Sequence, residues 1–415
     1  MTVARAAFNA STPTRHTDTL RIVKGALGPV PVCRLDIKPF TVFIGRQGTG
    51  KSLVAQVLYF FEELPYLAAF VEGSERGAAK WSDAEVARHL LNRLRSSNRA
   101  FTTFANPSVT IDYLRSAPYS KLFGERGTLR FNAQSVNRVI QPNQALRTLL
   151  HEARRHRGEK LRRAIFFPTE RMVISQLRTA MSEDLLSLPL TYTLFSDWMD
   201  LAAQTISAWE RGEPDSADAK WIATHGEKAL GGHVVRRGNQ WKWRYGRRKS
   251  QQFDIDMASS GQRANWSLSY LGQALFSLRE DRSVSRQITL FVEEPEIHLH
   301  PAAQVEILDI LAFLVNKGFR VVVTTHSLTL LYALNNLVQA YALNGNEDGK
   351  VPEESIRLSP DDVAVYGFKV GETPQSLVEP GTGFISEAML GGVADDLAAE
   401  LNRINLRVAR QESGE

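Results

Sequence analysis

Two groups of residues in this sequence have types and spacing that could do chemistry. The first is Gly45-Arg46-Gln47-Gly48-Thr49-Gly50-Lys51-Ser52, which lies between an apolar run (residues 40–44) and a helical pattern (residues 53–61). Glycines let the main chain wrap around phosphates while N–H groups point at the anion. In a G-x-x-x-x-G-K-S loop, Lys51 reaches the outer phosphates and the Ser52 hydroxyl binds Mg²⁺. A glycine turn that merely opens a helix is the alternative, and the complete strand, loop and helix context disfavours it.

The second group is a pair of carboxylates at the end of an apolar run. Residues 288–292 are followed by Glu293 and Glu294 and then by Pro295, which ends a strand. A buried parallel strand delivers such acids to the carboxyl edge of its sheet. Adjacent carboxylates repel each other unless a cation lies beside them, and Mg²⁺ holding a nucleotide phosphate would be one. A core strand followed by a solvated acidic turn explains the pair equally well when it is considered alone.

Three further segments place polar residues near the same sheet edge. Buried-strand patterns at residues 164–167 and 319–323 lead to Glu170 and to His326. Ligands of open α/β sheets bind at the carboxyl ends of strands, which favours a phosphate or water contact for His326 over the more common structural role. The third segment, Ser260-Gly261-Gln262, precedes a helical pattern and could cradle an anion, although any capped helix could carry it.

Length and composition exclude several classes of protein. The 415 residues are 43% hydrophobic and 23% charged, which is typical of a globular protein with room for a second lobe. The single cysteine, Cys33, excludes a disulfide framework and a cysteine-based zinc site and indicates a reducing, cytoplasmic location. No apolar run reaches the roughly 20 residues of a membrane span, so no membrane partner is expected. The first 21 residues could pass for a transit peptide, but a frayed tail is the better interpretation.

The charge balance permits a nucleic-acid partner without requiring one. The formal net charge is +5 and the sequence pI is about 9.2. A basic run at residues 154–163 could contact DNA, although such runs are usually solvated faces. A hairpin expected at residues 233–245 alternates aromatic with basic side chains. It could stack on single strands, but packing of its aromatic face on the core is preferred.

The order of phosphate loop, Ser-Ser-Gly-Gln, paired Glu and His resembles the heads of ABC-type ATPases, and among them the RecF/SMC-like and OLD-like AAA ATPases. The matching text comprises residues 258–263, the run Glu-Glu-Pro-Glu-Ile-His-Leu-His-Pro at residues 293–301, and Thr-His-Ser at residues 325–327. The resemblance implies an α/β fold, an ABC-type P-loop NTPase head with a mixed or parallel sheet and a large helical insertion. The expected domains are a flexible N-terminal tail (1–17), an ATPase core (18–61 and 164–400), a mainly helical insertion lobe (62–163) and a C-terminal tail (401–415).

The resemblance also implies roles for the matching residues. The phosphate loop binds ATP, and Mg²⁺ is held by Ser52, Glu293 and Glu170, the last of which stands at the Q-loop position. Glu294 is the base that orients the attacking water, and His326 is the switch histidine near the γ-phosphate. Two departures stand out, because Glu293 replaces the usual Asp and the Q-loop position lacks glutamine.

The resemblance further implies a partner. Ser260, Gly261 and Gln262 match the signature motif, which acts on ATP bound by the opposite subunit. An ATP-dependent homodimer is therefore expected, arranged head to tail about a two-fold axis.

Two biological roles fit these motifs. One is the sensor or regulatory ATPase of a phage-defence system, coupled to a separate effector protein, because OLD-like enzymes carry a nuclease module and no Glu plus Asp-x-Asp set follows His326. The other is a DNA repair or recombination ATPase that acts directly on DNA. The sequence encodes no sustained heptad pattern for a coiled-coil arm, which favours the first role. The long insertion and the Glu-Pro-Glu-Ile-His-Leu-His-Pro text disfavour a transporter subunit.

Overall fold

The structure is a computed structural model that describes most of the expected ATPase core. The described residues are 17–74, 109–114, 128–132, 162–171, 190–209, 214, 216–238, 240–245, 252–280, 287–343, 351–386, 400 and 402–404. Most of both terminal tails and most of the segment between residues 75 and 161 lie outside them. The domain boundaries at residues 62 and 163 therefore stay a prediction.

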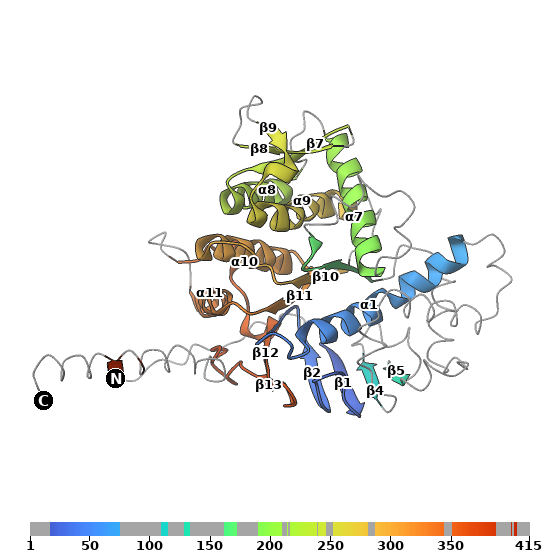
Figure 1. The fold of residues 1–415 in the computed structure, drawn as a ribbon, viewed down its shortest axis with the longest axis vertical. Helices are drawn as coiled ribbons and strands as arrows, with labels where there is room; N and C mark the ends of the chain where they lie inside the picture. The colour runs from blue at the N-terminus through green and yellow to red at the C-terminus, as the bar shows by residue number, and fades with distance from the viewer. Residues whose placement is uncertain are drawn as a thin grey trace, which may run out of the picture.

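A six-stranded sheet forms the centre of the molecule (Figure 1). Its strands run in the order β13-β12-β3-β11-β10-β6 and are β13 (Gln375–Ser376), β12 (Val363–Phe368), β3 (Phe40–Gly45), β11 (Arg320–Thr325), β10 (Ile288–Glu293) and β6 (Arg163–Phe167). All neighbours are parallel except β13, which is antiparallel to β12. Every residue of β3, β10 and β12 is buried, because both faces of the sheet are covered. The mixed α/β fold expected from the sequence is confirmed.

One face of this sheet packs against a helical layer (Figure 1). The layer contains α7 (Leu190–Ala208), α8 (Ala217–Leu230), α9 (Ser260–Glu280), α10 (Pro301–Asn316) and α11 (Leu328–Gln339). Successive residues of a strand point to opposite faces, so Leu290 and Val292 join the core under these helices while Phe291 joins the core on the other side.

The other face of the sheet packs against α1 (Lys51–Ser74), which is covered in turn by a second, antiparallel sheet (Figure 1). This sheet has the order β2-β1-β4-β5, with strands β2 (Cys33–Ile37), β1 (Asp18–Lys24), β4 (Thr110–Leu114) and β5 (Thr128–Asn132). Strands β4 and β5 complete this sheet by antiparallel pairing. They belong to the segment between residues 62 and 163, yet β4 pairs directly with β1.

The expected hairpin is present and packs its aromatic face inward. It consists of β7 (His233–Arg237) and β8 (Gln240–Arg244), and β9 (Gln252–Asp254) extends it to three strands. Trp243 is completely buried, and the ring of Trp241 lies 4.9 Å from that of Trp266 in α9. Packing on the core, the preferred interpretation of this pattern, is confirmed.

Local sequence signals set the starts of three helices around the sheet edge. The ring of His300 caps α10 by accepting a hydrogen bond from the N–H of Ala302, with proline in the first turn. Ser327 caps α11 through the N–H of Leu330. Helix α9 begins at Ser260, four residues before the periodic apolar pattern at 264, so the Ser-Gly-Gln text forms its first turn.

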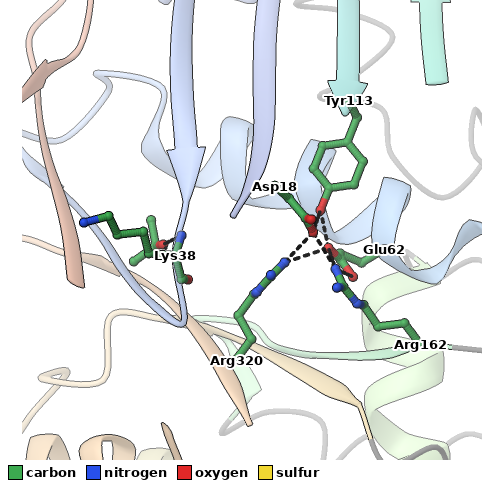
Figure 2. A network of polar contacts seen from close by, with 7 residues as sticks. Asp18, Lys38, Glu62, Tyr113, Arg162 and Arg320 are labelled. Atoms are coloured by element: carbon green, nitrogen blue, oxygen red, sulfur yellow. Dashed lines mark hydrogen bonds and ion pairs between the residues drawn. The ribbon is translucent and has the colours of Figure 1, made fainter. Parts of the chain in front are cut away.

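A buried network of charged residues joins the two sheets at the end of the core opposite the phosphate loop (Figure 2). The Arg162 guanidinium lies 2.5 Å from Asp18 and 2.9 Å from Glu62, and Arg320 lies 2.5 Å from Asp18. The Tyr113 hydroxyl donates to both carboxylates, at 3.0 Å to Asp18. Asp18 and Glu62 are at most 1% exposed, so each depends on these partners to stay charged.

We expect Arg162→Met to lower the free energy of unfolding by about 3–5 kcal/mol, since it leaves two buried carboxylates to share Arg320. The matched control is Arg34→Met, which removes an exposed arginine 3.1 Å from Asp36. The control should cost about 1 kcal/mol or less. Urea unfolding curves measure both, and equal shifts of the two midpoints would contradict the role of the network.

Candidate functional site

Four segments of the chain meet at the carboxyl edge of the parallel sheet. The register pairs Thr325 with Ile44 and Glu293 with Thr324, so the ends of β3, β11 and β10 lie level. Strand β6 ends beside β10 and leads into residues 168–171. The phosphate loop, His326, the paired glutamates and Glu170 therefore come together, as parallel strands require.

The main chain of the phosphate loop needs its glycines. Gly45, Gly48 and Gly50 all have positive φ, at 152°, 78° and 93°. A Cβ on Gly45 would lie 2.3 Å from the carbonyl oxygen of Phe368, so a side chain there is also excluded by close packing. Residues 46–48 at the tip are exposed, which leaves the curve of the loop open to an anion.

Lys51 is held by the curve of this loop. Its ammonium donates to the carbonyl oxygens of Gly45 and Arg46, each at 2.8 Å, and lies 3.5 Å from the hydroxyl of Thr49. Burial lowers the pKa of Lys51 to about 8, and the negative charge of Glu294 opposes that shift. The ammonium is thus desolvated in place before any phosphate binds, which strengthens its attraction for an anion.

Glu293 has the surroundings of a metal ligand. It is 5% exposed, and Oε2 accepts long hydrogen bonds from Thr169, at 3.4 Å to the N–H and 3.5 Å to the hydroxyl. Oε1 is buried with no hydrogen-bond partner. Burial raises the pKa of Glu293 to about 7, while the nearby Ser52 hydroxyl favours the charged form.

These two residues fit Mg²⁺, which is bound in nucleotide sites by few protein oxygens together with phosphates. Ser52 would supply a hydroxyl and Glu293 the unpartnered Oε1. A bound cation would also offset the cost of burying the carboxylate. Among the described residues no group of three or more His, Cys, Asp and Glu side chains is arranged to hold a metal ion.

Glu294 and His326 face each other across the ends of β10 and β11. Glu294 Oε1 lies 3.5 Å from His326 Nε2, and both side chains are partly exposed. Glu294 has φ 42°, and its N–H donates to the carbonyl of Thr324 at 2.8 Å. This left-handed backbone is unusual for a non-glycine residue and turns the carboxylate toward the histidine. A carboxylate and an imidazole in this arrangement can orient a water and share its proton.

Glu296 is a residue that sequence reasoning missed. One carboxylate oxygen, Oε1, accepts from the Thr325 hydroxyl and from the His326 N–H, both at 2.7 Å. It therefore fixes the turn that carries the imidazole. The signal was present as the third acid of Glu-Glu-Pro-Glu, but its partners are 29 and 30 residues away and no spacing rule finds them.

Glu170 lies close to Glu293 but is engaged elsewhere. Its negative charge raises the pKa of Glu293, whereas its own carboxylate accepts a hydrogen bond from the hydroxyl of Tyr192 in α7. A metal-ligand role for Glu170 stays a prediction. The next residue, Arg171, was also missed by sequence reasoning, and its guanidinium donates to the carbonyl oxygens of Glu293 at 2.7 Å and Glu294 at 3.2 Å.

The Ser260-Gly261-Gln262 segment lies beside the turn that follows the paired glutamates. A Cβ on Gly261 would lie 2.4 Å from the carbonyl oxygen of His298, so glycine is required by this approach. The Gln262 side chain accepts from the N–H of Ser259 and donates to the carbonyl of Leu230 at 2.8 Å. It is thus part of the packing, while Ser260 is exposed at the first turn of α9.

Residues 192–331 match the family model of the AAA ATPase domain. This range contains the segment at 260–262, both glutamates and His326, and the phosphate loop precedes it. This segment carries an AAA ATPase domain. With the phosphate loop, it is a P-loop ATPase that hydrolyses ATP.

The solved structures that match the chain include heads and cassettes of ATPases, at TM-scores below 0.5. An SMC head bound to the C-winged helix domain of ScpA shares 10% identity with this ATPase at a TM-score of 0.42, covering 88% of this chain and 98% of that chain. The SMC head of Thermotoga maritima shares 10% identity at a TM-score of 0.35, covering 87% and 98%. The ADP conformation of an ABC-transporter cassette shares 12% identity at a TM-score of 0.34, covering 93% and 99%. No curated protein sequence matches the chain.

Within the described part of the ATPase, no helix has both the length and the hydropathy needed to span a membrane.

We expect Glu296→Ala to lower the kcat of ATP hydrolysis about 10-fold with little change in ATP affinity, since His326 loses the acceptor that places it. Glu296→Gln keeps an acceptor oxygen and should stay within about 3-fold of the parent. Glu306→Ala is the control, because the carboxylate of Glu306 in α10 pairs with Lys228 of α8 at 2.5 Å. If Glu296→Gln lowers kcat as much as Glu296→Ala does, the loss comes from the missing negative charge and not from the hydrogen bonds to Thr325 and His326.

Proposed function

We propose that this ATPase is a switch that pairs head to tail with a second copy around two ATP molecules. The observation that supports this most strongly is the exposed start of α9. Ser259 and Ser260 lie at the N-terminus of a 21-residue helix, where backbone N–H groups favour an anion. The helix belongs to the core on one face of the sheet, whereas α1, which begins at Lys51, lies on the other (Figure 1). In this proposal the phosphate that α9 binds is the partner's, as the resemblance to ABC-type heads implies.

The residues at the sheet edge divide the work of hydrolysis. Lys51 and the loop N–H groups hold the phosphates, and Ser52 and Glu293 hold Mg²⁺, which supplies charge neutralisation when bound. Glu294 orients the attacking water and takes its proton, while His326 stabilises the charge that develops near the outer phosphate. ATP binding then joins the subunits and hydrolysis releases them.

For the biological role, we infer a sensor in antiviral defence that acts through a separate effector protein. The OLD-like motif text supports this role over direct action on DNA. The basic residues that the structure describes also support this role, because they are engaged in contacts within the protein. Arg162 and Arg163, at the end of the basic run, are buried or nearly so and form ion pairs inside the protein. In the hairpin, Lys242 lies 2.6 Å from Asp254 and Arg236 stacks over Trp241.

Glu294→Gln should bind ATP, hydrolyse it at least about 100-fold more slowly and accumulate as a dimer, because the base is lost while the phosphate contacts stay. Light scattering with and without ATP and Mg²⁺ measures the mass. The double variant Lys51→Ala/Glu294→Gln is the control and should stay monomeric, since it cannot hold the phosphates. A Glu294→Gln protein that binds ATP as a monomer would overturn the switch.

Linear duplex DNA at low salt should leave the steady-state ATPase rate unchanged if a protein partner gates the switch. Low salt is needed because phosphate contacts weaken steeply as salt rises. Strong stimulation that disappears in Lys51→Ala would favour the alternative, an ATPase of DNA repair or recombination.

A further inference from the structure

Arg171 is a buried cation that connects three segments of the active-site edge. It is 3% exposed, and its Nε donates to the carbonyl of Ala264 in α9 at 2.5 Å. Nη1 donates to the carbonyls of Pro168 at 3.1 Å and Glu293 at 2.7 Å. Nη2 donates to Asn265 Oδ1 and to the carbonyl of Glu294, at 2.8 and 3.2 Å. These five bonds match the five donors of a guanidinium.

All the hydrogen-bond acceptors of Arg171 are neutral. Four are main-chain carbonyls and the fifth is the amide oxygen of Asn265. A buried arginine is usually paired with a carboxylate, because an unpaired buried charge is costly. Here the negative charges of Glu293, Glu294 and Glu296 compensate from nearby without hydrogen bonds to Arg171, and burial lowers the pKa of Arg171 to about 10. The arginine thus holds the backbone of the two glutamates and leaves their carboxylates for Mg²⁺ and water.

Asn265 extends the connection along the first turns of α9. Its amide nitrogen donates to the carbonyl of Gly261 at 3.2 Å and to that of Ile297 at 3.0 Å. Together with the close approach of Gly261 to His298, this joins the helix start to the turn after β10. The end of β10 and the start of α9 are therefore linked through Arg171 and through Asn265, and a shift of one moves the other.

We propose that Arg171, with Asn265, is a positioning residue that couples the carboxylates of the ATP site to the signature helix that meets the partner subunit. The coupling rests on the proposed dimeric switch. When a bound ligand fixes the positions of Glu293 and Glu294, the Arg171 guanidinium passes this position of their backbone on to α9. The start of α9, which faces the partner's ATP, then takes a matching position. A single side chain thereby influences both the rate of hydrolysis and the stability of the dimer.

Arg171→Lys keeps the charge but replaces a five-donor planar fork by a single ammonium, which cannot span both segments. The ATP affinity of the variant should stay within about 3-fold of the parent, because the phosphate loop is intact, while kcat falls about 100-fold. In the Glu294→Gln background the ATP-dependent dimer should weaken by at least about 10-fold. ATP titration, steady-state kinetics and sedimentation give these three quantities.

The matched control is Arg357→Lys. Arg357 is 5% exposed and also donates to main-chain carbonyls, those of Pro352 and Leu343, each at 2.9 Å. This control should lose comparable stability in urea yet keep its kcat and its dimer. Equal losses of kcat per folded molecule in both variants would overturn the coupling.

Asn265→Ala provides an independent route if Arg171→Lys folds poorly. It should lower kcat and weaken the dimer in the same way, and its effect should largely vanish when added to Arg171→Lys, because one connection is broken by both. If the fold-loss of kcat in the double variant equals the product of the fold-losses in the two single variants, the residues act independently and the proposal is overturned. A parent protein that neither hydrolyses ATP nor dimerises would instead overturn the proposed switch itself, so the two failures are distinguishable.

Discussion

The central constraint on this ATPase is that its parallel sheet is covered on both faces. Charged groups do not lie in the middle of β3, β10 and β12, which are wholly buried, and they gather at the two ends of the sheet. At one end Asp18 and Glu62 meet Arg162 and Arg320 in ion pairs. At the other, a guanidinium uses neutral acceptors and the carboxylates keep open sites. Charged residues thus stabilise the fold at one end of the sheet and form the candidate site at the other. The two ends differ in whether the guanidinium groups bond directly to the carboxylates.

The sequence predicted those parts of the site whose signal is local. The phosphate loop, the paired glutamates and His326 each follow an apolar strand, and parallel pairing then brings the strand ends together. Glu296 and Arg171 could not be found in this way, because Glu296 bonds 29 and 30 residues away and Arg171 bonds 93 and 122 residues away. Their roles depend on packing between segments, which periodicity does not encode.

The glutamate at the metal-side position illustrates how the fold adapts to a longer side chain. Glu293 is the last residue of β10 and is buried, and Thr169, from the turn after β6, contacts only one of its oxygens. The extra methylene is accommodated within the sheet edge and does not push the carboxylate into solvent. Glu293 stays beside Ser52, whose hydroxyl favours the charged form of the carboxylate, so a hydroxyl and a carboxylate can still share one Mg²⁺.

Helix α1 has a consequence for how this ATPase could diversify. Glu62 and Glu63 in α1 are bonded to Arg162 and Arg163 at 2.9 and 3.0 Å, so the two ends of the chain between these pairs are held together. A loop whose ends are already joined can grow at small entropic expense, about 0.6 kcal/mol for each doubling of its length. Within this stretch β4 pairs with β1 and β5 with β4, whereas all six strands of the central sheet lie outside it, so their order does not depend on its length. The junction is a natural place for one catalytic head to acquire different recognition modules.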